Sequence, residues 1–251
     1  MQDVLEQSHT MMMASPSIDV ERLRQVPGWF TPLDQMLFGW LLEWQSSHGI
    51  SGDLVEMGVY KGKSAILMGA HLQKKETLVV CDLFGRPAGE EDISPSVSRF
   101  YRERLCRQDF EANYLGFIET LPRIVEGPSA VILQHVQPGS ARFVHIDASH
   151  RYSNVRQDIA SAQVMLLADG LVALDDYRTA HTPGVAAAVW ESVLGGALLP
   201  LCVSESKLYG TWGASSQIRR DLSEWLAARK LPHDLHDING LPLIRVAPPK
   251  K

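Results

Sequence analysis

From Asp53 onward, short apolar runs alternate with longer segments of helical periodicity, and this alternation restricts the fold more than any other feature. Such alternation is typical of β-α-β units, in which helices join parallel strands. The runs expected to form parallel strands are Leu54–Met57, Leu78–Cys81, Arg123–Val125, Phe143–Ile146 and Leu171–Leu174. Two further runs, Leu198–Val203 and Lys207–Trp212, are separated only by Ser204–Ser206, which predicts an antiparallel pair. We therefore expect an α/β fold with a doubly wound, mostly parallel, seven-stranded sheet.

Helical segments are expected between and after these strands, at Lys63–Leu72, Ser96–Asn113, Ser129–His135, Ser153–Leu167 and Gly184–Leu194. Another helix is expected ahead of the sheet, because Leu33–His48 carries apolar residues at helical spacing. Thr31 would cap it and Pro32 would be its first residue. We expect residues 1–50 to form a tail and a helical extension that serves as a lid or a dimer contact, and residues 51–251 to form the main domain.

The composition is that of an ordinary globular protein, with 251 residues of which 45% are hydrophobic and 21% charged. A net charge of -5 gives no basic excess for binding phosphates, so a nucleic acid is not an expected partner. The 3 cysteines are widely spaced and odd in number, which argues against a disulfide framework or a zinc site. No apolar run is long enough for a membrane span, and residues 1–17 lack the pattern of a signal peptide. We expect a cytoplasmic protein that acts on a small molecule.

The first strand leads into a glycine-containing turn at the edge where open α/β sheets bind ligands. Its spacing is E-x-G-x-x-x-G, formed by Glu56, Gly58 and Gly62, and Ser64 opens the following helix. Glycines let a ligand approach the backbone, and free amides at a helix start favour an anionic group. A purely structural turn is an equally open interpretation. The spacing differs from the G-x-G-x-x-G of nicotinamide sites, whereas Asp82, at the end of the second strand, suits ribose hydroxyls.

Five segments together resemble the class I S-adenosylmethionine-dependent methyltransferases, in the branch that includes macrocin O-methyltransferase-like and cephalosporin-hydroxylase-like proteins. They are VEMGVYKGKSA, VVCDLFG, RIVEGPSA, FVHIDASHRYSNVRQDI and GLVALDDYRTAHTPGV, and the resemblance runs from about Asp53 to Trp190. It implies a Rossmann-like fold and S-adenosylmethionine as cofactor. The residues that it places around the cofactor are Glu56, Gly58, Tyr60, Gly62 and Ser64 at the methionine moiety, Asp82 at the ribose, Ser129 at the adenine, and Asp147. A plain packing role for Tyr60 stays open.

A second acidic set follows the fourth and fifth predicted strands, where Asp147, Asp175 and Asp176 should converge. Clustered negative charge is costly unless a positive group offsets it, and oxygen ligands suit Mg²⁺ or another divalent cation. The chain must bend at Asp175 and Asp176 for both to reach one ion, because adjacent strand residues point to opposite faces. The resemblance to sugar O-methyltransferases favours this metal triad. The alternative is that one of the two caps the following segment.

Methyl transfer to a hydroxyl also needs a base to remove the proton. His150, three residues beyond Asp147, is the first candidate because imidazole titrates near neutral pH. His181 is the second, and the resemblance leaves open that Asp147 takes the proton itself. Cofactor contact or loop anchoring is the alternative role for His150. We interpret His145 as a buried packing residue.

The sequence thus predicts a Mg²⁺-assisted O-methyltransferase acting on a hydroxyl of a small molecule, such as a sugar or natural-product scaffold. The alternatives are a nicotinamide-dependent oxidoreductase and a non-catalytic nucleotide-binding protein. The polar stretch Phe84–Asp92 suits a lid or a plain surface loop. The extension contains four aromatic residues that suit an acceptor pocket or a contact in an expected homo-oligomer: Trp29, Phe30, Trp40 and Trp44. Helical spacing favours core packing for Trp40 and Trp44.

Overall fold

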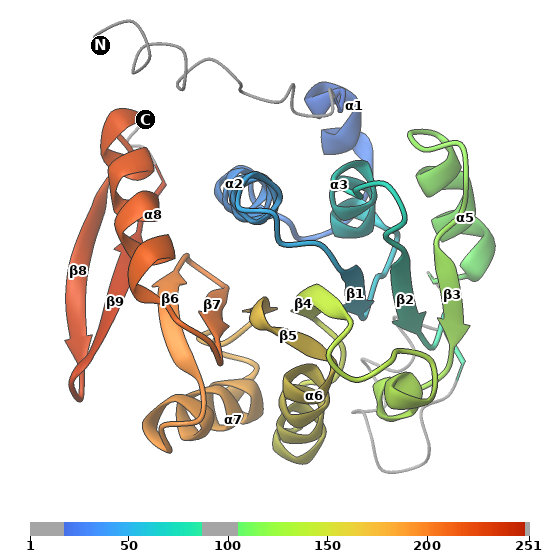
Figure 1. The fold of residues 1–251 in the computed structure, drawn as a ribbon. Helices are drawn as coiled ribbons and strands as arrows, with labels where there is room; N and C mark the ends of the chain where they lie inside the picture. Colours follow the sequence, from blue (N-terminus) through green and yellow to red (C-terminus); the bar gives the residue numbers. More distant parts are fainter. Residues whose placement is uncertain (1–17, 87–104, 249–251) are drawn as a thin grey trace, which may run out of the picture.

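The computed structural model describes residues 18–86 and 105–248. In this part of the chain, strands form one sheet in the order β3-β2-β1-β4-β5-β7-β6-β9-β8 (Figure 1). The strands are β1 Asp53–Met57, β2 Leu78–Asp82, β3 Arg123–Glu126, β4 Ala141–Ile146, β5 Leu166–Leu174, β6 Leu199–Val203, β7 Leu208–Thr211, β8 His233–Ile238 and β9 Leu241–Val246. β1 to β5 are parallel, and β7 runs antiparallel to both β5 and β6. The doubly wound α/β fold and the antiparallel pair β6–β7 are confirmed.

The expected strand number was wrong, because the described residues contain nine strands rather than seven. The additional strands are the hairpin β8–β9, which joins the sheet through parallel pairing of β9 with β6. β8 has the sequence HDLHDI, and polar residues occupy both of its faces, so it lacks the apolar alternation by which strands are recognised.

The helices are α1 Val20–Gln25, α2 Pro32–Ser47, α3 Lys63–Ala70, α5 Arg107–Leu115, α6 Tyr152–Met165, α7 Pro183–Leu194 and α8 Ser216–Ala228, with a 3-10 helix η2 at Ser129–Gln134. α2, α3 and α8 cover one face of the sheet, and α6 and α7 cover the other (Figure 1). α2 begins as predicted, with Pro32 as its first residue and the Thr31 hydroxyl accepting from the Asp34 amide. Within the described ranges, no helix has the length and apolar character to cross a membrane.

Three expectations fall wholly or partly outside the described residues. The N-terminal tail, residues 1–17, lies outside them. So do residues 87–92 of the predicted lid and residues 96–104 of the predicted helix Ser96–Asn113, of which α5 corresponds to the end.

Strand alternation decides which side chains reach which helices. On β1, Val55 packs with the α6 and α7 side of the core, and Leu54 packs with the α2 and α3 side. Glu56 shares the face of Leu54, and its register partner on β4 is His145, so both polar side chains lie beneath α2 and α3. The face of the N-terminal extension therefore contains these two polar groups, whereas the strand side chains on the opposite face are mainly apolar.

At the amino ends of the strands, away from these polar groups, a buried ion pair anchors α2 and the loop before β2 to β4. Arg142, near the start of β4, donates from Nε and Nη2 to the two carboxylate oxygens of Glu76, each at 2.9 Å. It also donates to the carbonyls of His71 and Leu42, and the Gln45 side chain donates to the Arg142 carbonyl at 2.6 Å. Since the guanidinium is fully paired, its burial is compatible with stability.

Candidate functional site

The turn after β1 owes its glycines to close contact with neighbouring elements. Gly58 has a φ of +83°, and a Cβ atom there would lie 2.0 Å from the carbonyl oxygen of Asp147. A Cβ at Gly62, whose φ is +90°, would lie 2.9 Å from the ring of Phe110. Tyr60 between them also has a positive φ, of 47°. The turn is therefore pressed against the end of β4, and Gly62 starts α3 without a side-chain cap, leaving that helix end open to a ligand.

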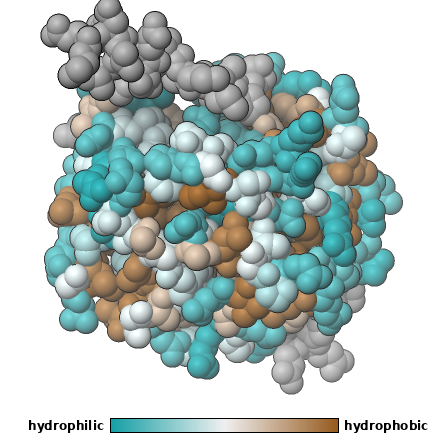
Figure 2. Space-filling view, viewed as in Figure 1, coloured by the Kyte–Doolittle hydropathy of each residue, from teal (hydrophilic) through white to brown (hydrophobic). Residues whose placement is uncertain are grey.

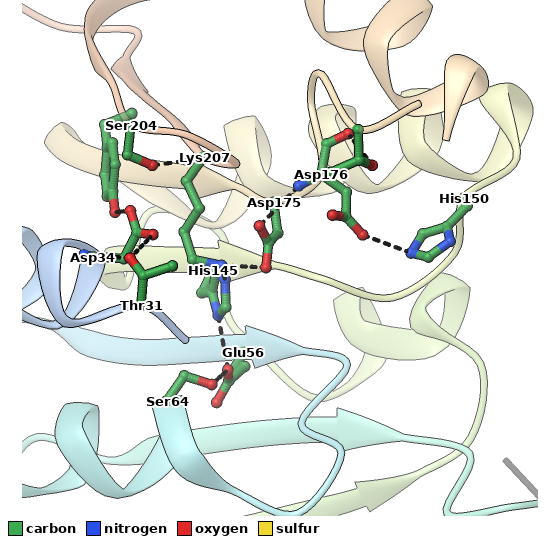
Figure 3. Close-up of polar contacts among 12 residues, drawn as sticks. Thr31, Asp34, Glu56, Ser64, His145, His150, Asp175, Asp176, Ser204 and Lys207 are labelled. Carbon is green, nitrogen blue, oxygen red and sulfur yellow. Dashed lines mark hydrogen bonds and ion pairs between the residues drawn. The ribbon is translucent and has the colours of Figure 1, made fainter. Parts of the chain in front are cut away.

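Glu56 lies fully buried at the base of this turn. Its Oε1 accepts a hydrogen bond from the Ser64 hydroxyl and lies 2.7 Å from His145 Nδ1 (Figure 3). Its Oε2 has no hydrogen-bond partner among the described residues. A buried, unpaired carboxylate oxygen is rare and costly, and it fits a donor such as the ammonium group of a bound methionine moiety.

Asp82 holds the turn in place from β2. Its Oδ2 accepts from the amides of Val59 at 2.7 Å and Tyr60 at 3.1 Å, and its Oδ1 accepts from the Phe84 amide at 2.8 Å. Burial raises the pKa of Asp82, and these backbone donors partly offset the rise. Three of the four acceptor sites are thus used, and one remains for a ligand hydroxyl. Ser129 begins η2 close by, since the Gly127 amide donates to the Asp82 carbonyl at 3.0 Å.

The three aspartates of the predicted metal triad all lie just beyond β4 and β5, but their ligand atoms fall into two groups. Asp147 and Asp175 gather with His145, within 4.8 Å of one another, and Asp176 gathers with His150 and His181. The chain does bend between the two adjacent aspartates, as Asp176 has a φ of 58°. Asp176 still acts on Asp147 electrostatically: burial, then Asp175, and more weakly Asp176, raise the pKa of Asp147 well above its usual value.

Sequence reasoning missed Lys207, at the start of β7, which supplies a positive charge from within the chain. Its buried ammonium forms an ion pair with Asp175 Oδ2 and lies 3.2 Å from His145 Nε2 (Figure 3). Burial alone would raise the pKa of Asp175, but Lys207, His145 and the Asp176 amide together outweigh it, and the pKa is lowered to about 2. Burial would lower the pKa of Lys207, and Asp175, Asp147 and Asp34 raise it instead. Lys207 is therefore a fixed cation.

These contacts form one hydrogen-bonded chain across the sheet. Lysine can only donate, so His145 Nε2 accepts from Lys207, and His145 Nδ1 then donates to Glu56. The chain connects the Glu56 carboxylate at the cofactor turn with the Asp175 carboxylate at the acidic set. His145 is buried and satisfied, as predicted, and it also bridges two predicted parts of the site. Its position two residues before Asp147, on the same strand face, is the sequence signal that could have indicated this.

The two candidate bases lie on the outer side of the acidic set. His150 Nε2 lies 3.2 Å from Asp176 Oδ2, and the imidazole is one-third exposed. Such a carboxylate fixes the ring orientation of a histidine. His181 is more exposed, and its ring centroid lies 6.1 Å from that of His150. The structure thus brings His150, His181 and Asp176 together.

The aromatic residues of the extension divide into core and surface positions. The Trp40 ring packs at a tilt against Trp225 of α8 and Trp44 donates to Asp221, so core packing of these two residues is confirmed. Phe30 is buried, and its ring lies 5.7 Å from the Lys207 ammonium. Trp29 is 70% exposed, and its ring centroid lies 5.3 Å from that of Tyr60 in the cofactor turn.

The sheet order reverses between β1 and β4, where the glycine turn and the acidic set meet, and in open α/β sheets this is the place where ligands bind. Residues 55–177 match the family model described as a methyltransferase domain, and this match is consistent with the class I S-adenosylmethionine-dependent methyltransferases that the chain resembles. This match favours methyl transfer over the nicotinamide alternative. No curated protein sequence matches the chain.

Solved structures share the fold at low sequence identity. The O-methyltransferase NovP is 20% identical, with a TM-score of 0.55 over 72% of this chain and 81% of NovP. A protein from Corynebacterium glutamicum is 13% identical, with a TM-score of 0.54 over 85% of this chain and 96% of that one. A putative O-methyltransferase from Klebsiella pneumoniae is 14% identical, with a TM-score of 0.51 over 84% and 96%. At these identities the likeness concerns the fold alone.

Proposed function

We propose that the protein transfers the methyl group of S-adenosylmethionine to a hydroxyl oxygen of a small molecule, with the help of Mg²⁺ or another divalent cation. The observation that carries this proposal is the contact between the cofactor turn and the acidic set. The Asp147 amide donates to the Met57 carbonyl at 2.8 Å, and Gly58 has no room for a Cβ because of Asp147. A methyl donor in the turn would therefore lie next to an acceptor held at the carboxylates, and methyl transfer requires this proximity.

The cofactor residues in this proposal are those expected from the sequence. Glu56, Gly58, Tyr60, Gly62 and Ser64 would surround the methionine moiety, supported by the unpaired Glu56 oxygen and the open start of α3. Asp82 would accept from one ribose hydroxyl, Ser129 would lie at the adenine, and Asp147 would lie beside the reacting centre.

The proposal places a divalent cation at Asp147, Asp175 and Asp176, and Asp176, which groups with His150 and His181, would have to turn toward the other two carboxylates to bind it. Lys207 offsets the charge of Asp175, and burial together with the charges of Asp175 and Asp176 raises the pKa of Asp147, an effect that a bound cation would oppose. Asp175 retains acceptor capacity beside its bonds from Lys207 and the Asp176 amide. A bound cation would lower the pKa of the acceptor hydroxyl and orient it.

The side chains then have distinct tasks. Asp176 orients His150, whose second ring nitrogen is the first candidate to receive the hydroxyl proton. Asp147 and His181 are the alternatives for this task. Residues 18–50 contribute Trp29 beside Tyr60, so we assign the acceptor-facing side of the site to the N-terminal extension. The identity of the acceptor, a sugar or another hydroxylated scaffold, belongs to this proposal, as does a cytoplasmic location.

Binding of the cofactor can be tested before the acceptor is known. Calorimetry with S-adenosylmethionine and with S-adenosylhomocysteine, in the presence of Mg²⁺, should give one site per chain. Glu56→Gln should weaken binding at least tenfold because an amide replaces the unpaired oxygen, whereas the exposed control Asp234→Asn should not. Absence of binding by the wild-type chain would refute the proposal, and saturable NADH binding would support the oxidoreductase instead.

The metal and the base have separate tests. Mn²⁺ added to the protein should give a bound electron paramagnetic resonance signal that Asp147→Asn and Asp176→Asn remove. Nitrogen coupling in that signal that His150→Ala abolishes would move the metal to the group of His150, Asp176 and His181, and unchanged Mn²⁺ binding by the aspartate variants would refute the site. Once an acceptor is found, His150→Ala should slow transfer about 100-fold, while a loss of only a few-fold would exclude it as the base.

A further inference from the structure

β8 ends the sheet, and its outer edge is unpaired among the described residues. Its central residue, Leu235, is 68% exposed, and the residues on both sides of it are exposed as well. At the left of Figure 1 the strand runs alongside α8 and β9, and the corresponding edge in Figure 2 is mostly hydrophilic with small hydrophobic patches. An open edge of this kind presents backbone donors and acceptors to another strand.

A second copy of the chain could pair with this edge only in certain registers. Two identical edge strands related by a two-fold axis perpendicular to the sheet run antiparallel. Residues opposite one another then point to the same face, so they must both be odd-numbered or both even-numbered. The axis therefore passes midway between the two copies of a single residue, which we call the centre. In the middle of β8 the centre can be Asp234, Leu235 or His236.

The sequence of β8 favours one of these centres. Centred on Leu235, each His233 lies opposite the partner's Asp237, and each Asp234 lies opposite the partner's His236. The two leucines meet at the axis. A centre at Asp234 or at His236 would instead place two identical polar groups opposite each other, which is unfavourable for like charges. HDLHD is thus self-complementary when read antiparallel.

Neighbouring charges are compatible with this pairing. On the face of Asp234, its carboxylate accepts from Arg245 of β9 at 2.8 Å and lies 2.7 Å from His236 Nε2. Arg245 therefore offsets the aspartate charge when two such faces adjoin. On the other face, one carboxylate oxygen of Asp237 accepts from the Gly240 amide. The second oxygen can face a histidine of the second copy.

We propose that two copies of this chain associate through antiparallel pairing of β8 with β8, centred on Leu235, so that one sheet continues across the dimer. The occupant of the edge is a second copy because the strand complements itself in charge and register. The proposal is independent of the catalytic one, since β8 and the carboxyl ends of β1 and β4 lie in separate parts of the sheet.

Cysteine cross-linking tests the register directly. The background variant is Cys106→Ser, which removes the exposed cysteine, since Cys81 and Cys202 are buried. Opposite Cα atoms lie about 4.5 to 5.5 Å apart, within disulfide reach, so Leu235→Cys should form a covalent dimer on mild oxidation. Asp234→Cys alone should not, because its copies are offset, but mixed with His236→Cys it should. Equal cross-linking of all single variants, or none at Leu235→Cys, would overturn the proposal.

The oligomeric state provides a second measurement. Light scattering after gel filtration should give about twice the chain mass of 27.9 kDa for the wild type. Leu235→Lys should be a monomer with an unchanged circular dichroism spectrum, because two lysines would meet at the axis. Leu194→Lys, at a comparably exposed leucine on α7, should stay dimeric. A wild-type monomer at tens of micromolar, or a dimeric Leu235→Lys protein, would refute the β8 interface.

Discussion

Replacing Lys207 with methionine tests the electrostatic design of the site most directly. Methionine retains much of the apolar stem and removes the charge. The variant leaves the Asp175 carboxylate buried without its ion pair and removes the hydrogen bond to His145 Nε2. The chain that connects Glu56 to Asp175 is then interrupted in the middle.

The size of the effect follows from the surroundings of Asp175. Because its pKa is lowered to about 2, its environment favours the ionised form by roughly 2 kcal/mol relative to an unfolded chain, at about 1.4 kcal/mol per tenfold change in proton affinity. Without Lys207, burial dominates and the carboxylate is penalised instead of favoured. We therefore expect Lys207→Met to lower the free energy of unfolding by about 3 to 5 kcal/mol at pH 7.

The sign of the pH dependence distinguishes this explanation from lost packing. In the wild type, the folded pKa of Asp175 lies below the unfolded one, so its contribution is complete above about pH 4 and is lost as the pH falls toward 2. In Lys207→Met the folded pKa should lie above the unfolded one. The difference in stability between the two proteins should therefore shrink as the pH falls from 7 toward 4, where the buried carboxyl becomes protonated.

Urea denaturation at pH 7 and pH 4, followed by circular dichroism, measures these differences. Lys207→Met/Asp175→Asn should recover more than half of the loss, because the two sites interact directly. Arg24→Met, which removes an exposed ion pair with Glu21 of α1, is the control and should cost less than about 1 kcal/mol. A loss below 1 kcal/mol, an equal loss at both pH values, or strictly additive variants would refute the reasoning.

Two further predictions concern the turn and the opposite end of the sheet. Gly58→Ala should lower the free energy of unfolding by more than about 3 kcal/mol in urea denaturation, because at a φ of +83° the new Cβ would collide with the Asp147 carbonyl. The control is Gly49→Ala, which has a similar φ of +72° but open space around the new Cβ, and it should cost only about 1 kcal/mol. Similar losses in both would contradict the close contact. Arg142→Met should cost about 3 to 5 kcal/mol by leaving the Glu76 carboxylate without its counter-ion, yet change the S-adenosylmethionine dissociation constant less than twofold by calorimetry. A large change in affinity would show that the two edges of the sheet are coupled.

Much of the fold follows from local sequence patterns. Apolar runs such as Leu78–Cys81 can be buried on both faces only in a parallel sheet covered by helices, and Thr31 with Pro32 defines the start of α2 through capping chemistry. Because parallel strands share a direction, the acidic residues at their carboxyl ends could be predicted to lie together at one edge of the sheet: Glu56, Asp82 and Asp147. β8 was missed because its exposed, polar faces carry no burial pattern.

Only the tertiary structure decided how the charges are paired. Lys207 and Asp175 are 32 residues apart, and they meet because β7 inserts antiparallel beside β5, a pairing that no local pattern specifies. The sequence determined that negative charge gathers at this edge and requires a positive group. The fold determined that a buried lysine supplies part of this positive charge, that Asp176 turns toward His150, and that His145 joins the two halves of the site. Each of these contacts depends on strand order and register rather than on residues that are neighbours in the sequence.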